Sequence, residues 1–179
     1  MQRTRNPDMR RAEITAAALD IIAESGLCKV SHRKIAGRAG VALGTTTYYY
    51  PSLRDLVLQA MTAAVEEWAT DFENRLADRE PAASVQNVLV DAAAEFVEQS
   101  TIAVVTCELY VHGARDDALR ELTNTWLQRV RNAVATVADP VRARAIVALL
   151  DGAMFQAVIL GEPFDRQSVG PAIACLLAD

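Results

Sequence analysis

Residues 31–50, SHRKIAGRAGVALGTTTYYY, restrict the fold more than any other part of the chain. Ser31 is suited to cap a short helix by accepting a backbone N–H bond, and the apolar Ile35 then faces a core. Gly40 can adopt the positive φ that ends such a helix. A second short helix runs from there to about Tyr50, where a proline stops it. The segment therefore predicts two short helices joined by a tight turn, the layout of a helix-turn-helix.

The remainder of the chain is also predicted to be helical. Apolar residues recur at the spacing of a helix, and no segment alternates as a strand does. Asn6 and Ser84 are expected to cap helices, and glycines and prolines mark the ends of others. Further helices are expected over about 7–25, 52–78, 84–99, 101–113, 116–137, 140–160 and 166–178. The predicted fold is all-α, with about nine helices.

The pattern IAxxAGV, followed by GTTTYYYPS and Leu56, resembles the DNA-binding end of the tetracycline-repressor (TetR) family. The resemblance is dense over about residues 10–60. Farther along, ELYVHGARDDALREL and LLDGAMFQAVILGEPFD are similar to stretches in the regulatory domains of some members. The resemblance implies a helix-turn-helix DNA-binding domain over residues 1–56 and a helical effector-binding and dimerisation domain over 57–179.

The same resemblance implies a function. Members of the family are sequence-specific transcriptional regulators, and we expect a homodimeric repressor that binds double-stranded DNA at a palindromic operator. A small apolar or aromatic effector would bind the helical domain and release the operator. Repression rather than activation rests on the resemblance alone.

Residue chemistry in the two short helices suits DNA. Threonine and tyrosine hydroxyls bond phosphates, and threonine methyls can pack on thymine methyls. Arg33 can read guanine through O6 and N7, and the alternatives of a phosphate contact or a solvated side chain stay open. The resemblance places Tyr48 and Tyr49 against phosphates and Tyr50 in the core. The expected DNA-binding residues are Ser31, His32, Arg33, Lys34, Leu43, Gly44, Thr45, Thr46, Thr47, Tyr48 and Tyr49.

Two departures from the family pattern leave a second function open. Ala42 stands where many relatives carry a serine that caps the second helix, and Leu53 stands where many carry a lysine or arginine. A missing cap costs about 1 kcal/mol. The alternative is a helical protein-interaction module with weakened DNA binding.

Charge is distributed unevenly along the chain. Residues 1–56 hold nine Arg and Lys against five Asp and Glu, whereas residues 57–179 hold nine against eighteen. A basic end suits phosphates, and an acidic body resists nonspecific wrapping by DNA.

The segment 140–160 is apolar on almost all sides, which predicts a helix buried all round. A symmetric dimer would bury it by pairing the last two helices of each copy in a four-helix bundle, as the resemblance also implies. The alternative is a central helix within a monomer. The expected dimer contacts are Ile146, Leu149, Leu150, Ala153, Ala157, Leu160, Ile173 and Leu176.

Aromatic residues on separate helices of the body predict a ligand pocket, because small-ligand sites are apolar with a few polar groups. The candidate lining residues are Trp68, Phe72, Phe96, Cys107, Tyr110, Trp126, Phe155 and Gln156.

Other classes of function find little support in the sequence. The chain has two histidines, no Gly-rich phosphate loop and no nucleophile elbow, so an enzyme is not expected. Glu108 and His112 have a spacing compatible with two metal ligands, but a simple side-chain pair is the expected interpretation, and no metal or cofactor is predicted.

Cysteine content and hydropathy indicate a cytoplasmic protein. Three widely spaced cysteines, Cys28, Cys107 and Cys175, argue against a disulfide framework. Each is expected to be a small buried apolar residue, with a redox sensor as the alternative. We see no apolar run near 18 residues and no signal peptide, so no membrane span is expected.

Overall fold

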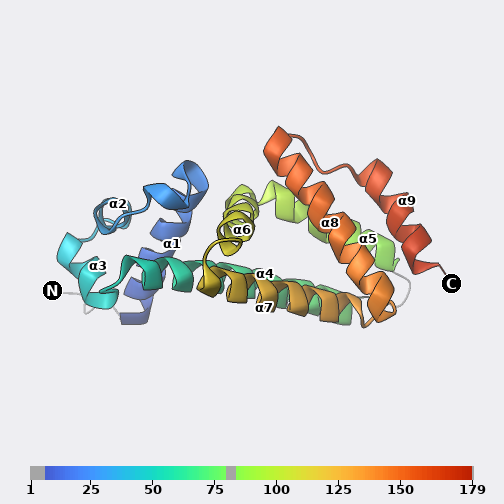
Figure 1. Cartoon of the computed structure of the whole chain (residues 1–179), viewed down its shortest axis with the longest axis horizontal. Helices are drawn as coiled ribbons and strands as arrows, with labels where there is room; N and C mark the ends of the chain where they lie inside the picture. The colour runs from blue at the N-terminus through green and yellow to red at the C-terminus, as the bar shows by residue number, and fades with distance from the viewer. Residues whose placement is uncertain (1–6, 80–83, 179) are drawn as a thin grey trace. The chain divides into compact units, whose positions relative to one another are not determined.

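The computed structural model describes residues 7–79 and 84–178, and all of its regular structure is helical (Figure 1). No strand occurs among these residues, which confirms the predicted fold class. The α-helices are α1 Pro7–Ser25, α2 His32–Arg38, α3 Leu43–Tyr49, α4 Leu53–Ala77, α5 Val85–Glu98, α6 Ser100–Gly113, α7 Asp117–Val134, α8 Pro140–Leu160 and α9 Arg166–Leu177. The expected cap Asn6 lies outside the described residues.

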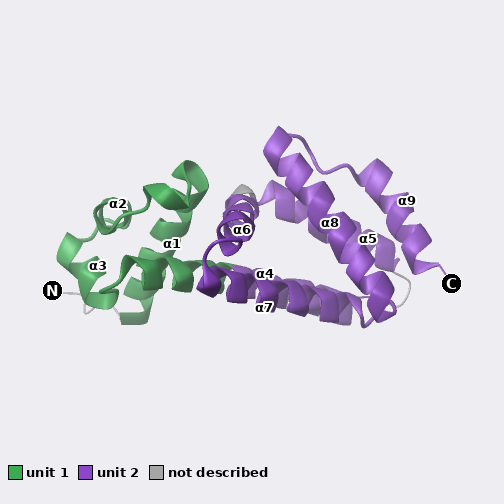
Figure 2. Ribbon diagram, viewed as in Figure 1, with its two compact units in different colours: residues 1–64 green, residues 65–179 purple. Residues whose placement is uncertain are grey.

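The chain divides into two compact units, Met1–Ala64 and Val65–Asp179 (Figure 2). The division falls within α4, as does the domain boundary expected after residue 56. Helix α4 therefore contributes residues to both units.

The first unit is a small helical domain with one apolar core. Helices α1, α2 and the first turns of α4 supply its side chains, and Tyr50 joins them with 4% of its surface exposed. Burying apolar surface in this way is the main stabilising contribution to such a domain. The core residues are Ile14, Ala17, Ala18, Ile21, Ile35, Tyr50, Leu56 and Ala60.

The second unit contains the remaining helices. Helix α8 packs against α5, α6, α7 and α9, and α5 also packs against α9 (Figure 1). The largest fully buried side chains of the second unit include Phe96, Leu109, Ile146 and Ile173. The core therefore forms around α8.

Helix α8 is nevertheless not buried on all sides. Ile159 and Leu160 at its end are 76% and 65% exposed, and Val141 at its start is 78% exposed. One side of α8 has no neighbouring helix in the described residues, so a single chain does not bury this helix all round. The alternative of a central helix within a monomer is therefore wrong for the described residues. By length and composition alone, α8 is also apolar enough to cross a membrane, a test that core helices of soluble proteins pass as well.

Several local details differ from the sequence prediction. A short 3₁₀ helix, Leu27–Lys29, follows α1, and α7 ends at Val134 because the next residues form turns. Ser84 occupies the N-cap position of α5, but its side chain makes no capping hydrogen bond. Cys28 and Cys175 are exposed rather than buried.

Candidate DNA-binding surface and effector site

The turn between α2 and α3 has the predicted geometry. The Ser31 Oγ accepts a hydrogen bond from the Lys34 backbone N–H at 3.3 Å, so α2 has its cap. Gly40 adopts a φ of +63°, which favours glycine. The Val41 N–H then donates to the Ala36 carbonyl at 2.9 Å and closes the end of α2. These bonds fix the direction in which α3 leaves the turn.

Helix α3 exposes one face of its seven residues. Leu43, Gly44, Thr47 and Tyr48 are exposed and share one side of a helix that turns 100° per residue. Leu43 keeps 50% of its surface exposed and Tyr48 keeps 80%. The N-cap residue Ala42 offers no side-chain bond, as its sequence predicts. The exposed face is the part of α3 that another molecule can reach.

Thr46 does not belong to this face. It is fully buried, and its hydroxyl donates to the Leu43 carbonyl at 2.8 Å. Its expected role as a DNA contact is therefore wrong, since a core threonine cannot reach a phosphate or a base. Thr45 and Tyr49 are half-buried at the edge of the exposed face.

Basic and aromatic groups flank α3. Arg33 and Lys34 are exposed in the first turn of α2. The guanidinium of Arg11 lies 5.4 Å from the ring centre of Tyr49, a cation–π contact that places α1 beside α3. His32 is half-buried, and neither of its ring nitrogens finds a hydrogen-bond partner.

Four of the aromatic residues expected to line a pocket form one cluster in the second unit. The ring centre of Trp68 lies 5.1 Å from that of Phe72, 5.0 Å from that of Phe96 and 5.1 Å from that of Trp126. Trp68, Phe72 and Trp126 line a small cavity together with Met154. The space open to the centre of a water molecule is about 20 Å³, which is room for about one water.

A carboxylate that the sequence analysis did not single out also lines this cavity. Asp151 accepts a hydrogen bond from the Tyr110 hydroxyl at 3.0 Å. Burial raises the pKa of Asp151 to about 6, against the lowering effects of that bond and of the Arg131 charge. Phe155 packs edge-on against Tyr110, with ring centres 4.9 Å apart. The sequence feature that could have identified Asp151 as a cavity residue is its position within the apolar run LLDGAMF.

Of the expected pocket residues, Phe96, Tyr110 and Phe155 pack beside this cavity without lining it, and the remaining two lie elsewhere. Gln156 lines an outer groove between α8 and α9, not the aromatic cavity, so its expected place is wrong. It lies on a different side of α8 from Asp151 and Met154. Cys107 is half-buried on α6, and burial raises the pKa of its thiol.

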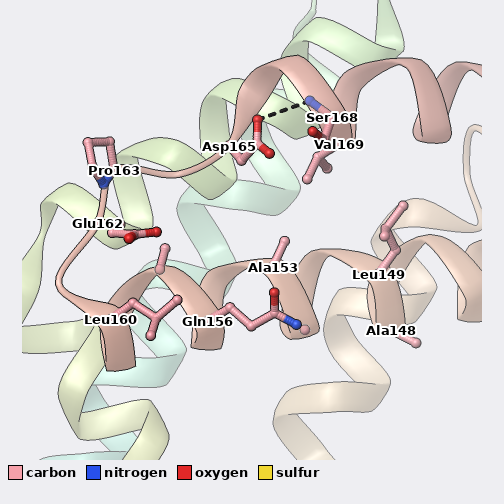
Figure 3. A pocket seen from close by; sticks show the side chains of 12 residues that line it. Ala148, Leu149, Ala153, Gln156, Leu160, Glu162, Pro163, Asp165, Ser168 and Val169 are labelled. Carbon is pink, nitrogen blue, oxygen red and sulfur yellow. Dashed lines mark hydrogen bonds between the residues drawn. The ribbon is translucent and has the colours of Figure 1, made fainter.

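The groove between α8 and α9 has a volume of about 420 Å³ (Figure 3). Leu149 and Ala153 project from α8 into the space beneath α9, and Asp165 caps α9 by accepting from the Ser168 N–H at 3.0 Å. Four expected dimer contacts line the groove: Leu149, Ala153, Ala157 and Leu160.

The other expected dimer contacts lie deeper. Ile146 and Ile173 are fully buried within the second unit, and Leu150 faces the aromatic cavity. The expected dimer contacts at Ile146 and Ile173 are therefore wrong, since a residue with no exposed surface cannot contact a second chain. Leu150 is 5% exposed and faces the cavity, so its expected contact is wrong as well. Leu176 is half-buried on α9.

The side-chain pair on α6 does not extend into a metal site. His112 Nε2 lies 3.3 Å from a Glu108 carboxylate oxygen. Among residues 7–79 and 84–178, no group of three histidine, cysteine, aspartate or glutamate side chains is arranged to hold a metal ion.

The capped two-helix motif with an exposed second helix, on an all-α chain, defines a helix-turn-helix DNA-binding regulator. A family model described as tetracyclin repressor-like, C-terminal domain, matches residues 78–179. The chain belongs to the TetR family of transcriptional regulators.

Individual relatives agree with this assignment. The chain is 35% identical to the Streptomyces coelicolor A3(2) transcriptional regulator SCO7518, with a TM-score of 0.77 over 96% of this chain and 99% of the other. It is 30% identical to the multidrug binding protein EbrR, solved with ethidium, with a TM-score of 0.77 over 95% and 99% of the two chains. It is 29% identical to the regulator CymR of Pseudomonas putida over 68% of this chain, but that match spans only 59% of CymR.

Proposed function

We propose that this regulator is a homodimeric, cytoplasmic repressor, not an enzyme, that binds a palindromic operator and is released by a small apolar or aromatic effector. The observation that supports the proposal is the exposed face of α3. The exposed Arg33 and Lys34 lie on the preceding helix, in the basic end of the chain. A helix with one free face and basic neighbours suits the major groove and its phosphates.

The proposed DNA contacts follow from exposure. Leu43, Gly44, Thr47 and Tyr48 would face the groove. The exposed Arg33 and Lys34 and the half-buried Ser31 would lie at its edge. The half-buried His32, Thr45 and Tyr49 are proposed as contacts at the margin. Arg33 would bond guanine O6 and N7, the pair of acceptors that a guanidinium group matches.

The groove between α8 and α9 supports the proposed dimer. It is apolar along α8, where Leu149, Ala153 and Leu160 line it, and it is open. Ile159 and Leu160 leave a large apolar area in contact with water, which a second copy would cover. A two-fold pairing of α8 and α9 gives a four-helix bundle. Such a dimer presents two helix-turn-helix motifs to two half-sites.

The aromatic cavity supports the proposed effector site. A carboxylate among Trp68, Phe72 and Trp126 is stabilised by a cation, which can also stack on those rings. EbrR has been solved with ethidium, with malachite green and with proflavin. We propose that the effector is a flat aromatic compound, and that Asp151 favours one with a positive charge.

The same cavity suggests how binding is coupled to release. Ligand pockets have volumes of about 300–1,000 Å³, and this cavity is far smaller. An effector must therefore separate the rings of Trp68 and Phe72 from that of Trp126. Since Trp68 and Phe72 belong to α4, which also contributes to the first unit, the effector would favour a different position of α4. The effector would then lower operator affinity by the ratio of its own affinities for the two positions of α4.

Selection of bound fragments from random duplex DNA by the purified full chain tests the DNA-binding function. The proposal predicts an enriched inverted repeat. Failure to enrich any sequence would contradict it and would favour the alternative of a protein-interaction module.

A further inference from the structure

The exposed face of α3 is chemically unusual for a surface that reads bases. Helix α3, LGTTTYY, contains no arginine, lysine, asparagine, glutamine, aspartate or glutamate. These are the side chains that make the strong polar contacts to base edges in the major groove. The face must therefore recognise bases through apolar contacts, or it makes no specific base contact.

The hydroxyl of Thr47 is directed back at its own helix. It lies 3.3 Å from the Gly44 carbonyl oxygen and 3.4 Å from that of Leu43, and it donates its proton to them. With the hydroxyl held there, the methyl group of Thr47 is left for the exposed side. Leu43 stands one turn earlier on the same side of the helix and is 50% exposed. The two side chains form a short apolar strip.

Gly44 adds an opening beside this strip. A Cβ built at Gly44 meets nothing within 4 Å, so the protein itself does not require a glycine there. The absence of a side chain leaves the backbone of α3 uncovered next to Leu43 and Thr47. A close approach of this side of the helix to a base pair is therefore possible.

We propose that the apolar strip of Leu43 and Thr47 reads the C5-methyl groups of thymine in each operator half-site. Thymine carries the methyl group that major-groove proteins contact with apolar side chains. Arg33 would supply the polar base contact, so specificity would divide between one guanine and neighbouring thymines. This inference rests on the proposed DNA-binding function.

Replacing thymine by deoxyuridine tests the inference, because it removes only the C5-methyl group and keeps the base-pairing edge. The operator selected by the full chain is synthesised with deoxyuridine at one thymine position in both half-sites. Burying one CH₂-sized group is worth about fourfold in affinity. We expect a loss of about fourfold per methyl contact, and about fifteenfold for two symmetric contacts.

Matched variants of Thr47 separate its methyl from its hydroxyl. Thr47→Val keeps a methyl group on the exposed side, whereas Thr47→Ser keeps only the hydroxyl. We expect Thr47→Val to bind nearly as well as the wild-type chain and Thr47→Ser to bind about fourfold more weakly per half-site. On the deoxyuridine operator, Thr47→Ser should bind nearly as tightly as the wild-type chain does, since the two changes remove the same contact.

Three outcomes would overturn the inference. One is an unchanged affinity when every thymine in turn is replaced by deoxyuridine. Another is that Thr47→Val weakens binding as much as Thr47→Ser, which would assign the contact to the hydroxyl. The third is failure to enrich any operator, which would overturn the proposed DNA-binding function and the inference with it.

Discussion

The Tyr110 hydroxyl donates a hydrogen bond to Oδ2 of Asp151 at 3.0 Å, at the edge of the aromatic cavity. The pKa of Asp151 in the folded chain is about 6, above its ordinary 3.8, because burial disfavours the carboxylate. The folded chain therefore binds this proton more tightly than the unfolded chain does. A group of this kind lowers the free energy of unfolding as the pH rises from about 4 to about 6.

Replacing this carboxylate should stabilise the fold at neutral pH. We expect Asp151→Asn to raise the free energy of unfolding at pH 7 by about 1–3 kcal/mol and to flatten its dependence between pH 4 and pH 6. Urea unfolding at several pH values measures this. Asp117→Asn, at a carboxylate that is 93% exposed, controls for the loss of one acidic charge. A destabilised Asp151→Asn chain at pH 7 would show that the buried carboxylate does not destabilise the fold.

The buried charge of Asp151 lowers the stability of the fold, and a cationic effector would pair with that charge. We expect proflavin, a planar aromatic cation, to raise the melting temperature at pH 7.5, where the carboxylate is charged. The shift should be much smaller for Asp151→Asn, because the buried charge that pairs with the ligand is gone. Equal shifts for the two chains would show that the charge of Asp151 does not recognise the ligand.

Arg33 and Lys34 allow a test of base reading. We expect Arg33→Ala to weaken operator binding by about 1–3 kcal/mol and to relax the preference at one base position. Lys34→Ala should weaken binding to all sequences alike, as the loss of a phosphate contact does. Binding to a set of operators with single base changes distinguishes them. A uniform loss for Arg33→Ala would assign it to a phosphate.

Gly44 and Gly37 form a matched pair, since a Cβ at either position meets nothing within 4 Å. Alanine at either site should leave the fold intact and stabilise it by up to about 1 kcal/mol, through higher helix propensity. Only Gly44→Ala should weaken operator binding, because only Gly44 lies on the exposed face of α3. Equal operator affinities for the two variants would contradict a close approach at Gly44.

Leu160 and Val141 test the proposed dimer. Both are highly exposed apolar residues of α8, but only Leu160 lines the groove beside α9. We expect Leu160→Glu to shift the chain toward monomer in sedimentation equilibrium, because it would place a charge in the interface. Val141→Glu should leave the assembly unchanged. A monomeric wild-type chain, or equal behaviour of both variants, would contradict the proposed interface.

The sequence predicted the elements of this fold well, for physical reasons. The cap at Ser31 and the positive φ at Gly40 depend on local chemistry, so both appear where the pattern placed them. Tyr50 was expected in the core and lies there. Helix ends set by weaker signals, such as the end of α7, were less accurate.

What the sequence did not predict depends on helix rotation and tertiary packing. Thr46 belongs to a run of three threonines, and only the direction of α3 shows that its side chain is buried. The role of Asp151 in the cavity depends on Tyr110, which lies on another helix and donates a hydrogen bond to it. Gln156 and Ile146 share α8, but the packing of its neighbours exposes one and buries the other.

Two copies of this chain are proposed to bind one inverted repeat through their helix-turn-helix motifs. Sedimentation of the full chain with the selected duplex, with affinity measured from 50 to 200 mM salt, tests it most directly. We expect two chains per repeat, far weaker binding to a single half-site, and a steep loss of affinity with salt. One chain per duplex, with equal affinity for the repeat and the half-site, would contradict it.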